Sequence, residues 1–313
     1  MAKKKWTLDQ MPEQAGRIAV VTGANSGLGY YTSQALARKG ARVIMACRNL
    51  EKGEVARQGI LNDGVAVAPE LWQLDLASLE SVMQFARKFM AGGMQLDLLI
   101  NNAGLMAIPY ARTVEGFEMQ FGVNHLGHFA LTAQLWPVLS GTRGSRLVQV
   151  SSLAHRFGKM NFEDLHGEQG YRKWQAYGMS KLANLLFVRE LARRLKENGS
   201  GVTVAAAHPG WAATELQAKG ARMKGNGLGA VSMNLVNKLL AQPGEQGALP
   251  SLYAATAEGV DQGEYYGPDG WMRMRGWPSQ DSPSNKLLND AVAARLWEVS
   301  ESLTGLESVS YTH

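Results

Sequence analysis

A tyrosine and a lysine four residues apart are the pair of side chains best suited to acid–base chemistry. Tyr177 and Lys181 fall within a stretch of helical periodicity from about Trp174 to Glu197, and residues i and i+4 share one helix face. A phenol with a reference pKa of about 10 is a poor acid or base at neutral pH, but a neighbouring ammonium and a positively charged bound cofactor both favour its phenolate. An amphipathic helix also produces this spacing by chance. We predict that Lys181 and a bound cofactor make Tyr177 a general acid and base.

A serine pair supplies a second polar group. Ser151 and Ser152 follow a predicted strand, Arg146–Val150, and the Ser152 hydroxyl is placed to hold a substrate oxygen. The alternative is a hydrolase that uses Ser152 with His155, but the chain contains no G-x-S-x-G motif. A metal enzyme is disfavoured as well, because the chain has a single cysteine and no H-E-x-x-H motif. We assign the two other histidines of this region, His125 and His128, to packing or capping.

A glycine-rich turn near the N-terminus predicts a phosphate-binding loop. The apolar run Ile18–Val21 reads as a strand buried on both faces, and a helix-permissive run follows from Tyr30 to Gly40. Between them, free N–H groups at a helix N-terminus would face an anion, and the glycines would let it approach the backbone. An ordinary glycine-rich turn is the alternative. The spacing is G-x-x-x-G-x-G, and the candidate ligands are Gly23, Asn25, Ser26, Gly27, Leu28 and Gly29.

The end of the second predicted strand indicates which dinucleotide is bound. The run Ala41–Cys47 ends at Arg48, and no acidic residue occurs before Glu51. In dinucleotide folds an acid at this point binds the ribose 2′-hydroxyl, whereas an arginine accommodates a 2′-phosphate. The sequence therefore favours NADP(H) over NAD(H). An arginine that simply faces water is the alternative.

Strands and helices alternate along the chain, which predicts an α/β fold: a Rossmann-type doubly wound parallel sheet with helices on both faces. We predict one domain over 1–313, with 1–15 as an N-terminal extension. Beyond those named above, the expected strands are Leu71–Leu74, Asp97–Ile100, Val202–Ala207 and a last one at Glu264–Tyr266, and the expected helices are Leu50–Leu61, Ser78–Met90, Val114–Leu139, Glu245–Ala257 and Lys286–Leu303. Ligands of such sheets bind at the carboxyl ends of the strands.

Six short motifs in a fixed order identify a family resemblance. TGANSGLG, NNAG, VNHLGHF, VSS, YGMSK and HPG together resemble the short-chain dehydrogenase/reductase family, over roughly Gly16 to Gly276. The stretches VSSLAHRFGKMNFEDLHGEQGY and YYGPDG are most similar to its retinol dehydrogenase-like and WW-domain-oxidoreductase-like branch.

This resemblance implies a role for each matched residue. Tyr177 would transfer the proton, Ser152 would polarise the carbonyl, Lys181 would bind the nicotinamide ribose, and Asn124 would hold a water in a proton relay. The helices that carry Asn124 and Tyr177 often pair two subunits in the family, which makes a homo-oligomer one option. Further cofactor contacts would come from Asp75 and Leu76 at the adenine, Asn102, Ala103 and Gly104 at the adjacent ribose, and Pro209, Gly210, Ala212 and Thr214 on the nicotinamide side.

Composition excludes several other classes of protein. The 313 residues are 45% hydrophobic and carry a formal net charge of +5, to which Lys3, Lys4 and Lys5 contribute. No basic stretch is interleaved with aromatic residues, so we expect no nucleic-acid partner. No apolar run approaches about 18 residues, so we expect no membrane span and a cytoplasmic protein. The only cysteine, Cys47, lies in an apolar run and is expected in the core.

Two apolar segments point to the substrate. The segment 211–240 follows a predicted strand end and mixes glycines with methionines and leucines, as expected of a movable lid. Trp271, Met272, Met274 and Trp277 form a second apolar-rich segment. Core packing explains such residues singly, but together they suggest an adaptable pocket. We predict a bulky apolar carbonyl or alcohol substrate, with a non-catalytic NADP(H)-sensing or scaffolding protein as the alternative.

Overall fold

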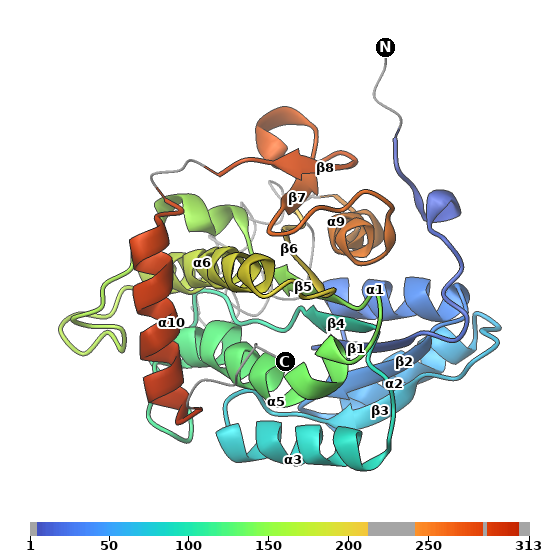
Figure 1. The fold of residues 1–313 in the computed structure, drawn as a ribbon, viewed down its shortest axis with the longest axis horizontal. Coiled ribbons are helices and arrows are strands. Elements are labelled where there is room, and N and C mark those ends of the chain that lie inside the picture. Colours follow the sequence, from blue (N-terminus) through green and yellow to red (C-terminus); the bar gives the residue numbers. More distant parts are fainter. Residues whose placement is uncertain (1–4, 212–241, 284–286, 307–313) are drawn as a thin grey trace, which may run out of the picture.

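The computed structural model describes residues 5–211, 242–283 and 287–306, and its core is one eight-stranded sheet (Figure 1). The strand order is β3-β2-β1-β4-β5-β6-β7-β8. Neighbouring strands are parallel from β3 through β7, and β8 pairs antiparallel with β7. The predicted doubly wound parallel sheet is thereby confirmed, with one antiparallel strand added at its edge.

The elements alternate as the sequence pattern predicts. The strands are β1 (Ile18–Thr22), β2 (Arg42–Cys47), β3 (Glu70–Gln73), β4 (Leu98–Asn101), β5 (Arg146–Val150), β6 (Thr203–Ala207), β7 (Tyr265–Pro268) and β8 (Pro278–Asp281). The α-helices are α1 (Gly27–Arg38), α2 (Leu50–Leu61), α3 (Leu79–Ala91), α4 (Met119–Phe121), α5 (Gly127–Ser140), α6 (Lys173–Glu197), α9 (Gly244–Thr256) and α10 (Asp290–Thr304). Short helices cover Leu8–Gln10, Gly122–Leu126, Leu153–Phe157 and Trp271–Arg273.

Helices bury both faces of the sheet. Successive residues of β1 point to opposite faces, so Val20 packs in one core, whereas Ala19 and Val21 pack in the other. The first core is formed with α3, α5 and α6, and the second with α1, α2 and α9. Cys47 is buried in the second core, where desolvation raises the pKa of its thiol to about 12. The placement of the cysteine in the core is confirmed.

Three predicted elements differ from the structure. The C-terminal helix begins at Asp290 and not at Lys286, because the Asn289 side chain caps it by accepting from the Val292 N–H. The helix expected from Val114 begins only at Met119, because a turn closes between Thr113 and Phe117 and the buried Glu118 carboxylate accepts from two N–H groups at the helix start. The strand at Tyr265–Pro268 is not the last one, since β8 follows. The sequence of β8, PSQD, is polar and begins with proline. It therefore lacks the hydrophobic alternation that marks a strand, but it suits the edge of a sheet.

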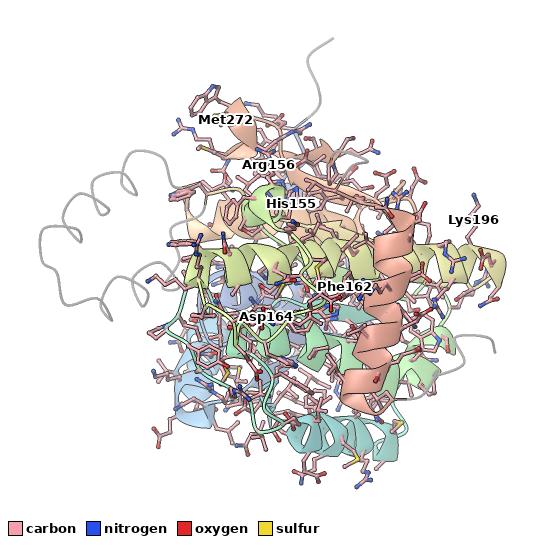
Figure 2. All side chains as sticks on the ribbon, turned by 90° about the vertical axis from the view of Figure 1, so that its left-hand side faces the viewer. His155, Arg156, Phe162, Asp164, Lys196 and Met272 are labelled. Atoms are coloured by element: carbon pink, nitrogen blue, oxygen red, sulfur yellow. The ribbon has the colours of Figure 1, made fainter. Side chains whose placement is uncertain are left out.

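The C-terminal helix α10 lies across the outer faces of α5 and α6 (Figure 1). Trp297 on α10 packs against Phe129 and Phe187, and Ser300 hydrogen-bonds to His125. α10 therefore covers part of the outer surface of the helices that carry Phe129 and Phe187. In Figure 2 α6 runs across the view, with Lys196 near its right-hand end and His155 above its left half.

The first described residues pack onto the domain. Met11 is buried in the second core, Trp6 contacts Tyr253 edge-on, and the Gln14 N–H donates to the Lys39 carbonyl at 2.7 Å. Within the described part of the chain, no helix has both the length and the apolar character needed to cross a membrane.

Candidate active site

The carboxyl ends of four central strands bring the predicted site residues to one edge of the sheet. Parallel registers join Val21 to Ile100, Asn101 to Gln149, and Val150 to Ala207. The glycine loop, the Asn102–Gly104 turn, the serine pair and the His208–Gly210 turn therefore follow strands that end side by side. This edge is where open α/β sheets bind ligands.

The glycine loop has the geometry of a close backbone approach. Gly23 and Gly27 have positive φ angles of 66° and 55°, which favour glycine. A Cβ on Gly29 would collide with the Gly23 carbonyl and lie 2.6 Å from the Asn102 side-chain nitrogen. No side chain caps the N-terminus of α1, whose N-cap is Ser26. The loop therefore fits a dinucleotide pyrophosphate, which would take the free N–H groups there.

The ends of β2 and β3 place Arg48 and Asp75 close together. Cys47 pairs with Gln73, and the Leu74 N–H donates to the Cys47 carbonyl at 3.0 Å. Arg48 is exposed just beyond this point. Asp75 caps the following turn through the Ala77 N–H at 3.0 Å, and the backbone of Leu76 leaves no room for a Cβ on Gly127.

A threonine at the end of β1 holds the Asn102–Gly104 turn, a predicted cofactor contact that we call the cofactor turn. The Thr22 Oγ1 atom accepts hydrogen bonds from the backbone N–H groups of Asn102 and Ala103, both at 2.9 Å. The Asn102 side chain returns a bond to the Thr22 carbonyl at 2.8 Å. Thr22 is completely buried. We did not identify this threonine from the sequence, although its position at a strand end before the glycine loop is a usable signal.

Tyr177, Ser152 and Lys181 lie together at the start of α6. The Ser152 hydroxyl lies close enough to the Tyr177 phenol to affect its pKa, and the Lys181 Nζ atom lies 6.0 Å from the centre of the Tyr177 ring. Lys181 Nζ also donates to the Val150 carbonyl at 3.2 Å. A Cβ on Gly104 would sit 3.3 Å from Lys181 Nζ, so the cofactor turn and the lysine meet directly.

Burial dominates the protonation equilibria of this group. Desolvation raises the pKa of Tyr177, and the neighbouring Ser152 hydroxyl lowers it by less. Desolvation lowers the pKa of Lys181 to about 8. In the cofactor-free chain Tyr177 is therefore a neutral phenol at pH 7. The predicted lowering of its pKa by Lys181 and cofactor stays a prediction for the complex.

Asn124 occupies a short π-helical segment, where the Gly127 N–H bonds to the Gly122 carbonyl. Its side-chain Oδ1 accepts from the Leu105 N–H at 2.7 Å, and its Nδ2 donates to the Leu105 carbonyl and to Ser180 Oγ, both at 2.9 Å. Both amide hydrogens are used, so the side chain holds the Leu105 backbone on one side and the Ser180 hydroxyl on the other. π-Helical turns of this kind are frequent at functional sites.

The contacts of His155 do not suit a hydrolase. Its Nδ1 atom lies 2.6 Å from the Ser152 carbonyl oxygen, not from the hydroxyl, and the hydroxyl accepts from the Ala154 N–H at 3.2 Å. Desolvation lowers the pKa of His155 to about 4. A nucleophile–base pair requires the imidazole at the serine hydroxyl. The His155 ring instead holds the serine turn by contacting the backbone carbonyl of Ser152.

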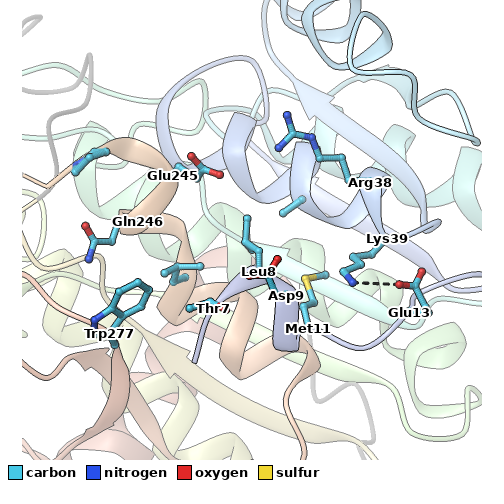
Figure 3. A pocket seen from close by; sticks show the side chains of 13 residues that line it. Thr7, Leu8, Asp9, Met11, Glu13, Arg38, Lys39, Glu245, Gln246 and Trp277 are labelled. Atoms are coloured by element: carbon cyan, nitrogen blue, oxygen red, sulfur yellow. Dashed lines mark hydrogen bonds and ion pairs between the residues drawn. The ribbon is translucent and has the colours of Figure 1, made fainter. Parts of the chain in front are cut away.

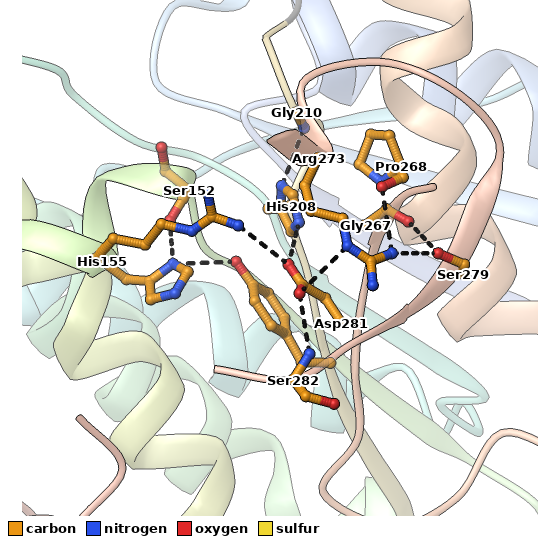
Figure 4. Close-up of polar contacts among 12 residues, drawn as sticks. Ser152, His155, His208, Gly210, Gly267, Pro268, Arg273, Ser279, Asp281 and Ser282 are labelled. Carbon is orange, nitrogen blue, oxygen red and sulfur yellow. Dashed lines mark hydrogen bonds and ion pairs between the residues drawn. The ribbon is translucent and has the colours of Figure 1, made fainter. Parts of the chain in front are cut away.

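A polar network joins the serine turn to the His208–Gly210 turn (Figure 4). The Gly210 N–H donates to His208 Nδ1 at 3.1 Å, so the other ring nitrogen, Nε2, carries the proton that reaches Asp281 Oδ2 at 3.0 Å. Arg156 and Arg273 flank the same carboxylate at 4.0 and 3.6 Å. Figure 2 shows Arg156 and Met272 at the same end of the molecule. Asp281 could not be predicted from the sequence, because no pattern of residues indicated the strand β8 that carries it.

Other predicted site residues fall elsewhere. Ala212, Thr214 and all of the proposed lid except Trp211 lie outside the described residues. Pro209 is partly buried beside the turn at Gly210, and its carbonyl accepts from the Gln242 side chain at 2.7 Å. Among the described residues no group of three or more histidine, cysteine, aspartate or glutamate side chains is placed to hold a metal.

An open pocket of about 740 Å³ lies away from this edge, between the N-terminal segment, α1 and α9 (Figure 3). Its charged side chains include Arg38, Glu245 and the Lys39–Glu13 ion pair at 3.1 Å. None of the residues predicted to carry chemistry lines it.

The amino-acid sequence is similar to those of known dehydrogenases. A family model described as short chain dehydrogenase matches residues 17–225. Retinol dehydrogenase 13 from Homo sapiens is 43% identical over 298 residues, which cover 94% of this chain and 86% of that protein. Retinol dehydrogenase 12 from Mus musculus is 42% identical over 294 residues, which cover 93% of this chain and 87% of that protein.

Two solved structures extend the likeness to three dimensions. An uncharacterized protein from Mycobacterium Paratuberculosis is 42% identical, with a TM-score of 0.79 over 96% of this chain and 98% of that one. The Pseudomonas aeruginosa RhlG/NADP active-site complex is 25% identical, with a TM-score of 0.63 over 80% and 94% of the two chains. The chain therefore belongs to the short-chain dehydrogenase family, in the branch of the retinol dehydrogenases.

Proposed function

We propose that this chain is an NADP(H)-dependent oxidoreductase that interconverts a carbonyl and an alcohol on a bulky, apolar substrate. The observation that carries the proposal is the grouping of Ser152, Tyr177 and Lys181 at the strand edge that also holds the glycine loop, with Ser152 close enough to Tyr177 to lower the pKa of its phenol. Membership in the family supports an oxidoreductase, whereas the choice of cofactor and of substrate is our inference.

The chain's own residues can perform the proton transfer. Tyr177 is a phenol at neutral pH, so it can donate its proton to a carbonyl oxygen as that oxygen gains charge. The Ser152 hydroxyl holds the same oxygen and stabilises the developing charge. When bound, the reduced dinucleotide supplies the hydride. Lys181 would bind the ribose and hold positive charge near the phenolate that remains.

Arg48 supports NADP(H) over NAD(H). It is exposed immediately after β2, next to the turn at Asp75, where the adenosine ribose lies in dinucleotide folds. A guanidinium recognises a 2′-phosphate through charge-assisted hydrogen bonds. The Pseudomonas aeruginosa RhlG structure is a complex with NADP, which is consistent with this choice.

Apolar side chains near the site support an apolar substrate. Phe157, which contacts Gly178 one residue after Tyr177, is 56% exposed, and Met272, whose carbonyl accepts from Arg156, is also 56% exposed. Trp174 contacts the Tyr177 ring edge-on and is 48% exposed. The relatives named retinol dehydrogenases are consistent with an apolar alcohol or aldehyde.

A screen of NADPH consumption across steroid, retinoid, aliphatic and aryl carbonyls tests the proposal, with the alcohol product measured beside the cofactor. We expect stoichiometric alcohol formation from at least one apolar class. A chain that binds NADPH tightly but consumes none with any carbonyl would be the sensing or scaffolding protein instead.

A further inference from the structure

His128 lies between Thr22, at the end of β1, and Asn124, in the π-helical segment, two residues that are far apart in the sequence. Its Nε2 atom is 2.9 Å from Thr22 Oγ1, and its Nδ1 atom is 3.1 Å from the Asn124 carbonyl oxygen. All three residues are at most 1% exposed. Both ring nitrogens are thus within hydrogen-bond distance of groups that belong to the cofactor turn on one side and to the π-helical segment on the other.

Counting protons assigns the direction of both bonds. Thr22 Oγ1 already accepts from the N–H groups of Asn102 and Ala103, which uses both of its lone pairs. Its single hydrogen must therefore be donated, and His128 Nε2 at 2.9 Å is a far better acceptor than the Ile100 carbonyl at 3.5 Å.

The other ring nitrogen then carries the imidazole proton. A carbonyl oxygen can only accept, so Nδ1 donates to the Asn124 carbonyl. The imidazole is neutral in this arrangement, because a proton on Nε2 would leave the Thr22 hydroxyl hydrogen facing another donor. Desolvation favours the same state and lowers the pKa of His128 to about 3.

The chain of bonds continues to the predicted catalytic tyrosine. Asn124 Nδ2 donates to Ser180 Oγ at 2.9 Å, and Ser180 Oγ donates to the Tyr177 carbonyl at 2.8 Å. Buried hydrogen bonds through His128, Asn124 and Ser180 therefore link the backbone of the cofactor turn to the backbone of Tyr177 in α6. His128 is the member that crosses from β1 to the helix carrying Asn124.

We propose that His128 is a positioning residue, held as the Nδ1–H tautomer, which sets the spacing between the dinucleotide-binding turn at Asn102–Ala103 and the Asn124–Tyr177 side of the site. It touches neither substrate nor cofactor in this role. The consequence for cofactor binding rests on the proposed function, whereas the tautomer and the bonds do not.

The first test measures the tautomer in the intact protein. Nitrogen-15 NMR of the full chain labelled on histidine, with and without NADP⁺, should give His128 a pyrrole-type Nδ1 and a pyridine-type Nε2 from pH 6 to 8. The resonance is assigned by its loss in His128→Gln. A proton on Nε2, or a charged ring in this range, would overturn the proposal whether or not the chain binds a dinucleotide.

The second test separates positioning from simple packing. His128→Phe keeps the ring but removes both bonds, and we expect the Kd and the KM for NADP(H) to rise on the order of tenfold, with the carbonyl KM changed less than about twofold. His128→Gln can still accept from Thr22 and donate to Asn124, and should recover most of the affinity. The matched control is His125→Phe, another fully buried ring on the neighbouring turn, which should leave both constants unchanged.

Two variants of Thr22 test the proposal even if His128→Phe does not fold. Thr22→Ser keeps the hydroxyl and should preserve the Nδ1–H tautomer of His128. Thr22→Val removes the hydroxyl, so His128 should no longer be held in that tautomer and the affinity for NADP(H) should fall. Folded His128→Phe that binds NADP(H) like the wild type would contradict the proposal. Wild-type protein that binds no dinucleotide would contradict the proposed function instead, and the tautomer would still decide the role of His128.

Discussion

The ammonium nitrogen of Lys181 donates a hydrogen bond to the carbonyl oxygen of Val150, at 3.2 Å. Val150 is the last residue of β5, and the Asn184 side chain donates to the same carbonyl at 3.0 Å. The lysine is thereby held against a rigid strand end, immediately before the serine pair. A Cβ built on Gly104 would lie 3.3 Å from the same nitrogen, so the lysine also adjoins the Asn102–Gly104 turn.

Cofactor affinity should depend on pH through Lys181. Burial lowers its pKa to about 8, so the free protein loses the ammonium as the pH rises through that value, and NADP(H) loses a charged partner. We expect the Kd for NADPH to rise between pH 7 and pH 9.5. Lys181→Met should bind more weakly at pH 7 and lack this rise, as measured by cofactor fluorescence titration. Parallel pH profiles in the two proteins would remove Lys181 from the binding site.

Arg48 should set the choice of cofactor. Arg48→Asp removes the partner of a 2′-phosphate and adds a group that can bind a ribose 2′-hydroxyl. A charge-assisted hydrogen bond contributes about 1.5–3 kcal/mol, so roughly one to two decades of preference for NADPH should be lost. The measurement is kcat/KM with NADPH and with NADH for both proteins. Wild-type protein that uses NADH at least as well as NADPH would show the assignment to be wrong.

Gly29 should tolerate no side chain. An alanine Cβ there meets the Gly23 carbonyl and the Asn102 side chain, and such overpacking costs about 1–3 kcal/mol. We expect Gly29→Ala to lower the thermal midpoint and to weaken NADPH binding by at least about tenfold. Gly201→Ala is the matched control, because no atom lies within 4 Å of its added Cβ. Equal effects in both variants would argue against a close approach at Gly29.

Acid should destabilise the protein through its buried histidines. Desolvation lowers the pKa of His125 to about 3 from a usual 6.5, so the folded state stays neutral where the unfolded chain binds a proton. The resulting loss of stability begins below about pH 6.5 and grows until about pH 3. Each tenfold change in proton affinity corresponds to about 1.4 kcal/mol. Urea unfolding from pH 7 to pH 4 should show a smaller loss for His125→Phe than for the wild type.

Substrate preference should follow apolar size. Each buried CH₂ contributes about 0.8 kcal/mol, so kcat/KM should rise about fourfold per methylene along a series of alkyl ketones until the pocket is full. A flat or falling trend, or better activity on a sugar or a hydroxy acid, would exclude an apolar pocket.

Local chemistry explains how much of this arrangement could be predicted from the sequence. The glycine loop and the Tyr177–Lys181 pair have short fixed spacings, and alternating apolar strands and helices are enough to order the central sheet. Thr22 and His128 could not be predicted in the same way. Their roles depend on partners about 80 and 106 positions away, respectively, which only the fold brings together.

The edge strand β8 could not be predicted from the sequence either. The polar strand β8 offers no hydrophobic alternation, so the sequence did not predict that Asp281 pairs with His208 beside the Gly210 turn. The helix expected from Val114 failed for a related reason. Its first residues have helical composition, but the Thr113–Phe117 turn and the buried Glu118 cap delay the helix to Met119.

The most direct measurement of the central claim is single-turnover reduction of an apolar carbonyl by NADPH in wild-type protein and in Tyr177→Phe. The phenylalanine keeps the ring and removes only the proton donor. We predict nearly unchanged NADPH binding and a rate of alcohol formation at least about a hundredfold lower, the usual contribution of general acid catalysis. Equal rates in the two proteins would contradict Tyr177 as the proton donor.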